Sequence, residues 1–286
     1  MPRIRKLPLG ALLLAMATTN IAFGQTHTLV SVGDHRLDVV RVGSGGPPVV
    51  FETGLADSLN VWLPMLHTVS AYTTAIAYSR AGFGRSDPGP ADHSVPHAVS
   101  DLHELLRRLQ IKPPYVLVAR SYGSLISRLY VSRYPSEVAG IVLVDGTHER
   151  QVERFGTLDS TYPRKFREYF DSVLSTLPAG PEAAEIRETV KIQAAGAVPG
   201  LEPLPDIPIA VLTSMKSDES APYVNGTARG HIVWRDLHDE WFHRSRNGIH
   251  IQTTRSGHGI QDDEPGLVAD AIKFVVDRVS LTSQPR

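Results

Sequence analysis

The sequence contains no cysteine. This absence excludes disulfides, thiolate nucleophiles, iron–sulfur clusters and cysteine-based zinc sites. Neither sign of charge is in large excess, because 29 Lys and Arg residues stand against 30 Asp and Glu residues. A nucleic-acid partner is therefore not expected. The 286 residues are 42% hydrophobic and 21% charged, which is typical of a globular enzyme stabilised by its apolar core.

The first 24 residues differ in composition from the rest of the chain. Three cations precede the uncharged stretch LPLGALLLAMATTNIAFG. A basic start, an apolar segment and the small residues Ala22 and Gly24 are the pattern of a signal peptide cleaved before Gln25. An uncleaved anchor is the alternative, but polar residues interrupt the run, and about 20 apolar residues are needed to span a bilayer. The sequence thus predicts a secreted or periplasmic protein without stable membrane insertion after cleavage.

After residue 25, short apolar runs alternate with amphipathic segments. Runs that are apolar on both faces indicate buried, mostly parallel strands. We expect strands at residues 28–32, 35–42, 47–52, 73–78, 115–119, 140–145, 207–213 and 248–253. We expect helices at about residues 59–70, 95–110, 122–134, 230–246 and 265–279. The first two strands read as a hairpin, so the sequence predicts an α/β fold with a doubly wound, mostly parallel eight-stranded sheet.

Residues 147–205 break this alternation. They carry two segments of helical periodicity, RKFREYFDSVLSTL and PEAAEIRETVKIQAAG, separated by proline and glycine. Such a length between two strands is too great for a connecting loop. We therefore expect an inserted helical cap at 147–205, over the sheet edge where ligands bind in open α/β folds, and a core made of residues 25–146 and 206–286.

Ser121 is the most informative residue of the sequence. It stands in YVLVARSYGSLISRLYVSRYP, between an apolar strand and an amphipathic helix. A serine at a sharp strand-to-helix turn exposes its hydroxyl above the sheet, and its strained backbone needs small neighbours. Ala119 and Gly123 provide them, in a variant of the G-x-S-x-G nucleophile elbow. A serine that only caps the helix is the alternative; the surrounding strand and helix favour a nucleophile.

With this elbow the chain resembles the α/β-hydrolase fold family, from about residue 35 to residue 280. Three further motifs stand in the family's order. VVFETGLADSLNVW resembles the oxyanion loop after the third strand, AYSRAGFGRSDP resembles the family's D-x-x-G-x-G-x-S-D-x-P turn, and SGHGIQDDEP resembles the turn that presents the catalytic base. We expect the Arg80–Pro88 turn to be structural, with Asp87 holding it.

His258 lies between Gly257 and Gly259, after the last expected strand. A short flexible turn can lay its imidazole against the serine, and the family's chain order of serine, acid and histidine is kept. A serine hydroxyl needs a base that takes its proton during attack. His258 is therefore the predicted base. His238 and His243 are five residues apart, which is not the spacing of a zincin helix, and neither a metal nor a cofactor is predicted.

Two aspartates compete for the third position of the triad. Asp145 ends the sixth strand directly after an apolar run, on a rigid support from which a carboxylate can reach His258. Asp218 follows the seventh strand, the position that the resembled family uses most often, in a polar loop that also offers Glu219. Both keep the chain order. The resemblance favours Asp218 slightly, and Asp145 stays open.

The resemblance also implies where a negatively charged carbonyl oxygen is stabilised. The family uses one backbone N–H after the nucleophile and one from the loop after the third strand, which are Tyr122 and Leu55 here. Gly54 matters because this backbone must come close to the substrate. Two further residues are candidates for substrate contact. Arg120 could bind an anionic group or pair with a carboxylate, and His148 could line the pocket or only begin a helix.

Together these residues predict an exported serine hydrolase. Ser121 attacks the carboxylic ester of a small molecule, or an amide or lactone, and water cleaves the acyl-enzyme with His258 as base. Epoxide hydrolases and haloalkane dehalogenases also resemble the chain, but they need a carboxylate nucleophile at the elbow. The alternatives that remain are a serine acyltransferase and a non-catalytic binding protein that keeps the fold.

Overall fold

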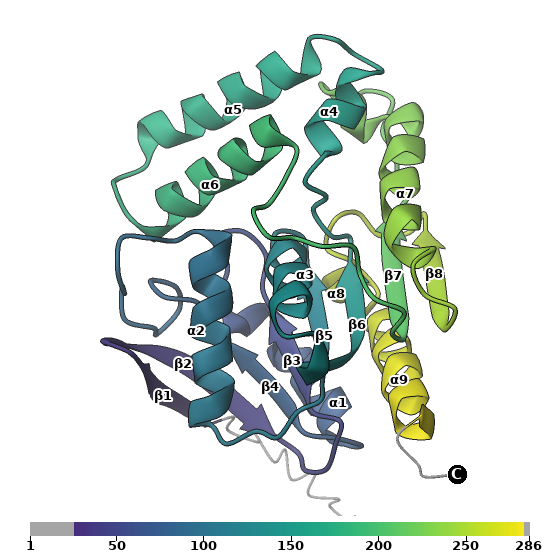
Figure 1. Cartoon of the computed structure of the whole chain (residues 1–286). Helices are drawn as coiled ribbons and strands as arrows, with labels where there is room; N and C mark the ends of the chain where they lie inside the picture. Colours follow the sequence, from purple (N-terminus) through teal and green to yellow (C-terminus); the bar gives the residue numbers. More distant parts are fainter. Residues whose placement is uncertain (1–25, 283–286) are drawn as a thin grey trace, which may run out of the picture.

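The computed structural model describes residues 26–282, and the expected signal peptide at residues 1–24 lies outside them. One eight-stranded sheet runs through the molecule (Figure 1). Its strands follow the apolar runs of the sequence and are β1 (His27–Val32), β2 (His35–Val42), β3 (Val49–Glu52), β4 (Ala75–Tyr78), β5 (Tyr115–Arg120), β6 (Val138–Val144), β7 (Ile209–Ser214) and β8 (Gly248–Thr253). Their order across the sheet is β1-β2-β4-β3-β5-β6-β7-β8.

The sheet is antiparallel only at its beginning. β1 pairs with β2, and β2 with β4, in antiparallel register, while all further pairs from β4 to β8 are parallel. The predicted hairpin and the predicted doubly wound sheet are thus confirmed. β3 begins two residues later than expected, at Val49. The reason is that Pro47 and Pro48 have no N–H group to donate to a strand ladder.

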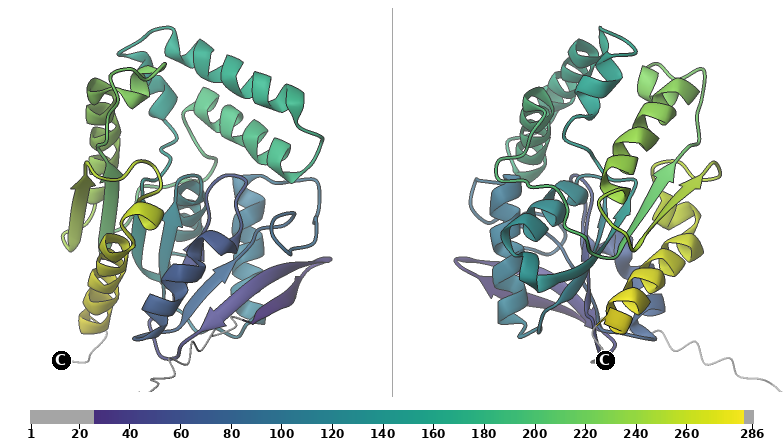
Figure 2. Two further views of the ribbon diagram at one scale, coloured as in Figure 1. Left: turned by 180° about the vertical axis from the view of Figure 1, so that it is seen from behind. Right: turned by 45° about the vertical axis from the view of Figure 1, so that its right-hand side comes forward.

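Helices cover both faces of the sheet (Figures 1 and 2). On one face α2 (Val95–Arg108) and α3 (Gly123–Arg133) pack against alternate strand residues such as Leu117. On the other face α1 (Leu63–Ser70) and α9 (Pro265–Thr282) pack against the residues between them, such as Val116. Successive strand residues point to opposite faces, so an uninterrupted apolar run supplies two cores at once. The remaining helices outside the insertion are η1 (Leu59–Trp62), η2 (Pro135–Glu137), η3 (Val224–Gly226), α7 (Ala228–Phe242) and α8 (Ile260–Asp263).

Three helices stand between β6 and β7, over the carboxyl ends of the strands (Figure 1). They are α4 (Gln151–Gly156), α5 (Tyr162–Thr176) and α6 (Pro181–Ala195). Pro181 opens α6 at a position where its missing N–H costs nothing, and Gly196 ends it with a φ of 62°. The expected helical insertion is present, while its boundaries at 147 and 205 as a separate domain stay a prediction. Among the helices of residues 26–282, none combines the length and the apolar character needed to cross a bilayer.

Candidate active site

Ser121 lies at the turn from β5 into α3, with a φ of 48°. A left-handed conformation is strained for a residue with a side chain, and it must be held by its surroundings. The Ser121 N–H donates to the carbonyl of Val144 at 3.2 Å, and the Ser121 carbonyl accepts from Thr147 N–H at 2.9 Å. The hydroxyl of Ser124 donates to the same carbonyl at 2.7 Å. The turn is therefore fixed on both sides of the serine.

Gly123 lets this turn pack against the end of β3. A Cβ atom at residue 123 would lie 2.5 Å from the Thr53 carbonyl oxygen and 2.7 Å from Cγ of Glu52. Both distances are shorter than a carbon atom tolerates, so the second glycine of the elbow motif is required by contact. The sequence pattern thus reflects the close approach of the elbow to the loop that follows β3.

His258 joins Ser121 to an aspartate in the structure. Its Nε2 atom lies 2.9 Å from Ser121 Oγ, and its Nδ1 atom lies 2.7 Å from Oδ2 of Asp145. An ionised carboxylate only accepts hydrogen bonds, so Nδ1 carries the proton that it donates to Asp145. The neutral imidazole then has its lone pair on Nε2, toward the serine hydroxyl. This is the arrangement that a base needs to take the serine's proton.

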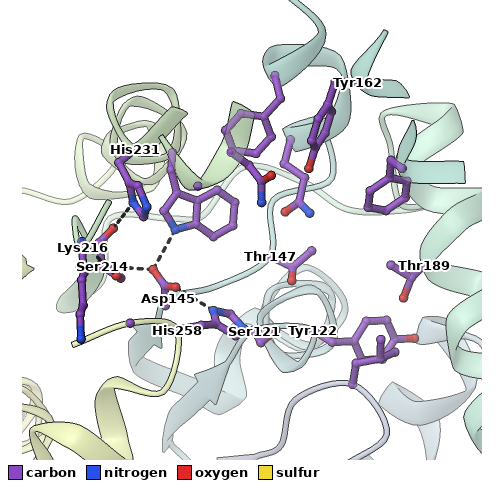
Figure 3. Close-up of a pocket in the computed structure, with 18 of the residues that line it drawn as sticks. Ser121, Tyr122, Asp145, Thr147, Tyr162, Thr189, Ser214, Lys216, His231 and His258 are labelled. Atoms are coloured by element: carbon purple, nitrogen blue, oxygen red, sulfur yellow. Dashed lines mark hydrogen bonds and ion pairs between the residues drawn. The ribbon is translucent and has the colours of Figure 1, made fainter. Parts of the chain in front are cut away.

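Asp145 is the first residue after β6 and is almost fully buried. Its Oδ1 atom accepts from Ser214 N–H at 2.9 Å and from the indole N–H of Trp234 at 2.8 Å (Figure 3). Burial alone would raise the pKa of this carboxyl, but the hydrogen bonds from His258 and Trp234, together with the electrostatic attraction of His258 whenever that imidazole is protonated, lower it below its ordinary value. Asp145 is therefore held ionised in the interior.

Asp218, the favoured candidate from the sequence, does not contact His258, so that expectation is corrected. Its Oδ1 atom accepts from the N–H of Ser220 at 2.8 Å and from the Ser220 hydroxyl at 2.6 Å, in an exposed loop. Glu219 in the same loop accepts from Ala228 N–H at 2.8 Å and is likewise occupied. Asp218 thus closes a local turn, as polar residues after a strand commonly do, and Glu219 bonds the first N–H group of α7.

Leu55 and Tyr122 both line the pocket above Ser121. Within the described chain, no backbone carbonyl or side chain accepts a hydrogen bond from the N–H of either residue. Gly54 lies against Ser121: a Cβ atom at residue 54 would be 3.6 Å from Cβ of Ser121 and 3.3 Å from an Arg120 nitrogen. The geometry thus leaves two backbone donors free beside the serine, although their role stays a prediction.

The two residues expected to touch the substrate lie elsewhere. Arg120 donates to Oδ2 of Asp57 at 2.7 Å and is not among the pocket residues, so the alternative of pairing with a carboxylate describes it. His148 is buried, stacked on Trp241 and close to Glu149, outside the pocket. Burial lowers the pKa of His148 to about 3, so it is a neutral core residue. Its expected place in the pocket is corrected.

The pocket above Ser121 has a volume of about 430 Å³. Its cap side is aromatic, and its rim near β7 is polar (Figure 3). The aromatic part is formed by Phe155, Tyr162, Phe166 and Phe170 of the cap, together with Trp234 of α7. The polar part is formed by Ser214, Lys216, Asn225 and His231. Apolar walls with a few polar groups are typical of small-molecule sites.

Residues 47–192, about half of the chain, match the family model described as alpha/beta hydrolase fold. The chain belongs to the alpha/beta hydrolase family. Among curated proteins it is similar to the uncharacterized protein YqjL of Bacillus subtilis (strain 168), with 27% identity over 234 residues. That match covers 81% of this chain and 84% of YqjL, so the two proteins are alike over most of their lengths.

Solved structures of low sequence identity share the hydrolase fold. A crystal structure of DBJA (mutant dbja delta) has a TM-score of 0.70 and 16% identity, and the match covers 90% of this chain and 99% of that one. A thermophilic esterase from Thermogutta terrifontis (malate bound) has a TM-score of 0.61 and 17% identity, with 89% and 99% covered. At such identities the likeness establishes the fold alone.

Several residues of this hydrolase site were not found from its sequence. Trp234 and Ser214 hold the carboxylate of Asp145, and Thr189 of α6 lines the pocket. Each reaches the site from an element far along the chain, and no local motif marks it. An aromatic residue on a helix that follows a strand is common, so a sequence offers no signal that separates Trp234 from a core residue.

Proposed function

We propose that this alpha/beta hydrolase cleaves the carboxylic ester of a small molecule through an acyl-enzyme on Ser121. The single observation that supports this most is the unbroken hydrogen-bond chain from Ser121 through His258 to Asp145. The three side chains come from three separate loops at the carboxyl edge of the sheet. Convergence of a nucleophile, a base and a buried carboxylate is the arrangement that acyl transfer requires.

In the proposed mechanism Ser121 Oγ attacks the ester carbonyl while His258 Nε2 takes its proton. The imidazolium is stabilised by ionised Asp145, which keeps the proton on Nδ1 throughout. The N–H groups of Leu55 and Tyr122 stabilise the oxyanion. His258 then protonates the leaving alcohol, and the acyl-enzyme remains. Water, deprotonated by the same imidazole, attacks the acyl carbonyl and releases the acid and the free serine.

The pocket suggests an ester with one apolar or aromatic portion. Four aromatic side chains of the cap and Trp234 of α7 offer surface to such a group, and about 430 Å³ is enough for a small ligand. The side chain of His258 is 53% exposed, so water reaches the base directly. Easy access of water favours hydrolysis over transfer to another acceptor. The Thermogutta terrifontis protein of the same fold is described as an esterase, in keeping with this reaction class.

Labelling with a fluorophosphonate tests the nucleophile. We expect one label per chain on Ser121, an initial burst of p-nitrophenol from p-nitrophenyl esters, and loss of both in Ser121→Ala. The loss of turnover is on the order of 10⁶-fold when a triad nucleophile is removed. Ser127→Ala is the matched control, because Ser127 lies on the same helix, α3, and its buried hydroxyl has no hydrogen-bond partner among residues 26–282. Full labelling of Ser121→Ala would refute the assignment.

The same labelling and ester assays distinguish the two alternatives, a non-catalytic binding protein and a serine acyltransferase. A non-catalytic binding protein would show neither labelling nor turnover. A serine acyltransferase would form more transfer product than free acid when a primary alcohol is added at a low fraction of the water concentration. We also propose export: the protein recovered from the periplasm or the medium is expected to begin at Gln25, and an intact Met1 there would contradict this.

A further inference from the structure

A buried ion-pair cluster joins the cap to the core beside the active site. Arg80, from the turn after β4, donates to Glu52 Oε1 at 2.6 Å and to Glu185 Oε1 at 2.6 Å. Arg80 also donates a second hydrogen bond, from Nη2, to Glu185 Oε2 at 3.0 Å. Relative exposure is 4% for Arg80, 1% for Glu52 and 2% for Glu185. We call these three residues the latch; Glu52 belongs to β3 and Glu185 to cap helix α6.

The latch also holds the loop that contains Leu55. Arg80 donates through Nη1 to the carbonyl and hydroxyl oxygens of Thr53 at 3.1 and 2.8 Å, and through Nη2 to the Gly54 carbonyl at 2.7 Å. Glu185 Oε2 accepts from Ala56 N–H at 2.9 Å. The peptide groups on both sides of Leu55 are therefore bonded to the latch.

The bond to the Gly54 carbonyl is decisive, because this carbonyl and the Leu55 N–H belong to one planar peptide group. When Arg80 fixes the direction of the oxygen, it fixes the direction of the N–H on the opposite side. A charged donor on the oxygen also polarises the peptide and strengthens its N–H as a donor. Leu55 lines the same pocket as Ser121, so the bond from Arg80 fixes the direction of an N–H group at the edge of that pocket.

A contribution to folding stability does not explain well why these charged residues are buried. Buried ion pairs are often no more stable than well-packed apolar side chains, because burial removes the hydration of each charge. Ala56 has a φ of 52°, a conformation that L-residues avoid and that a surrounding structure must impose. A strained loop held by buried charges beside a nucleophile is instead what positioning of a backbone donor requires.

We propose that Glu185 is a positioning residue, which acts through Arg80 and Ala56 to aim the Leu55 N–H at the oxyanion. The oxyanion donor is then in place only while α6 of the cap is seated on the core. Thr189, one turn after Glu185, lines the pocket and donates to the Glu185 carbonyl at 2.9 Å, so a bound substrate contacts the same helix. This inference rests on the proposed function, because it presupposes acyl transfer at Ser121.

The test compares Glu185→Gln and Glu185→Ala with Glu188→Gln in the full chain. Glu188 is a buried carboxylate on the same helix, paired with Lys191, and is the matched control. With p-nitrophenyl butyrate, we expect kcat to fall about 10-fold in Glu185→Gln and about 100-fold in Glu185→Ala, with KM changed less than threefold. The upper bound is the 10²- to 10³-fold effect of removing an oxyanion donor.

A second measurement separates positioning from a general loss of structure. A trifluoromethyl ketone of the same chain length forms a tetrahedral adduct with Ser121, and its Ki should rise in parallel with the loss of kcat. The Ki of the corresponding unreactive amide should change little. End-point fluorophosphonate labelling of Ser121 should stay complete, which shows that the folded site and its nucleophile remain intact.

An unchanged kcat in Glu185→Ala overturns the inference, and so does an equal loss in Glu188→Gln or a change confined to KM. Should Glu185→Ala fail to fold, the more conservative Glu185→Gln decides by the same criteria. Arg80→Lys gives an independent reading, because it keeps the charge but not the planar fork, and it should also lower kcat. If Ser121→Ala remains active, the proposed function itself fails. If Ser121→Ala is inactive but the Glu185 variants keep the wild-type kcat, only the inference about the latch fails.

Discussion

Asp145 and Asp218 each follow a neighbouring parallel strand, yet they have opposite surroundings. Asp145 comes directly after the last residue of β6, whereas Asp218 is four residues beyond the end of β7. One carboxylate is buried under three hydrogen-bond donors, and the other is exposed and bonded to the next turn. The comparison teaches that an aspartate directly continuous with a strand is better placed to contact His258 than one at the position that the family most often uses. The end of a strand fixes the position of a side chain, whereas in a polar loop a carboxylate accepts hydrogen bonds from its own neighbours in the chain.

The largest expected effect follows from exchanging each aspartate for asparagine. Asp145→Asn should lower kcat by up to about 10⁴-fold, because the amide no longer keeps the proton on His258 Nδ1 or stabilises the imidazolium. Asp218→Asn should leave kcat within about twofold. Circular dichroism and ester hydrolysis on both folded variants check this. If Asp218→Asn is the crippled one, the contact seen for Asp145 does not carry the reaction.

A smaller effect is expected from the indole that bonds to Asp145. Trp234→Phe keeps an aromatic wall but removes one donor to a buried carboxylate, and kcat should fall about tenfold, since a hydrogen bond to a charged group contributes about 1.5 kcal/mol. Trp241→Phe is the matched control, because its buried indole N–H has no partner among residues 26–282. Equal rates for Trp234→Phe and wild type would show that Ser214 and His258 suffice.

The smallest expected effect concerns His238, a buried histidine near Asp145, and its contribution to how the free energy of unfolding depends on pH. His238 is buried, donates through Nε2 to the Gly146 carbonyl at 2.8 Å, and burial lowers its pKa to about 4. Between about pH 6.5 and pH 4 the unfolded chain binds a proton here that the folded chain does not, so stability is full above pH 6.5 and falls as the pH drops. The whole difference corresponds to at most about 3 kcal/mol.

Urea unfolding at a series of pH values measures this dependence. His238→Asn should be less stable than wild type at pH 7 but should lose less stability between pH 6.5 and pH 4. His243→Asn, which changes an exposed histidine just after the same helix, should follow the wild-type curve. Parallel curves for all three proteins would assign the acid sensitivity to other groups.

The fold could be predicted from the sequence because its signals are local. Apolar runs mark strands, and the mostly parallel sheet is confirmed down to the hairpin across Gly33. The elbow serine is followed two positions later by Gly123, which close contact with the end of β3 requires, and the structure brings Ser121 and His258 together. These residues could be found because the chemistry and the turn lie in the same few positions.

The remaining residues of the site depend on contacts between distant segments. Glu185 meets Arg80 across 105 positions, and Trp234 meets Asp145 across 89. A family position favoured Asp218 over Asp145, but the direction and length of the loop after β7 decided otherwise. No periodicity or spacing in the sequence indicates where a loop turns, so the contact between His258 and Asp145 could be found only in the structure.

Trp234 has one further consequence, which concerns how the reaction can be observed. The sequence has three tryptophans, and two of them, Trp62 and Trp241, are buried away from the pocket. Trp234 alone among the three lines it, with its indole bonded to the carboxylate of Asp145, which in turn contacts His258. An acyl group entering the aromatic wall changes the polarity around this one fluorophore. The protein thus carries its own optical probe: if the proposed acyl-enzyme forms, stopped-flow measurement of Trp234 emission follows its formation and hydrolysis on esters that have no coloured product.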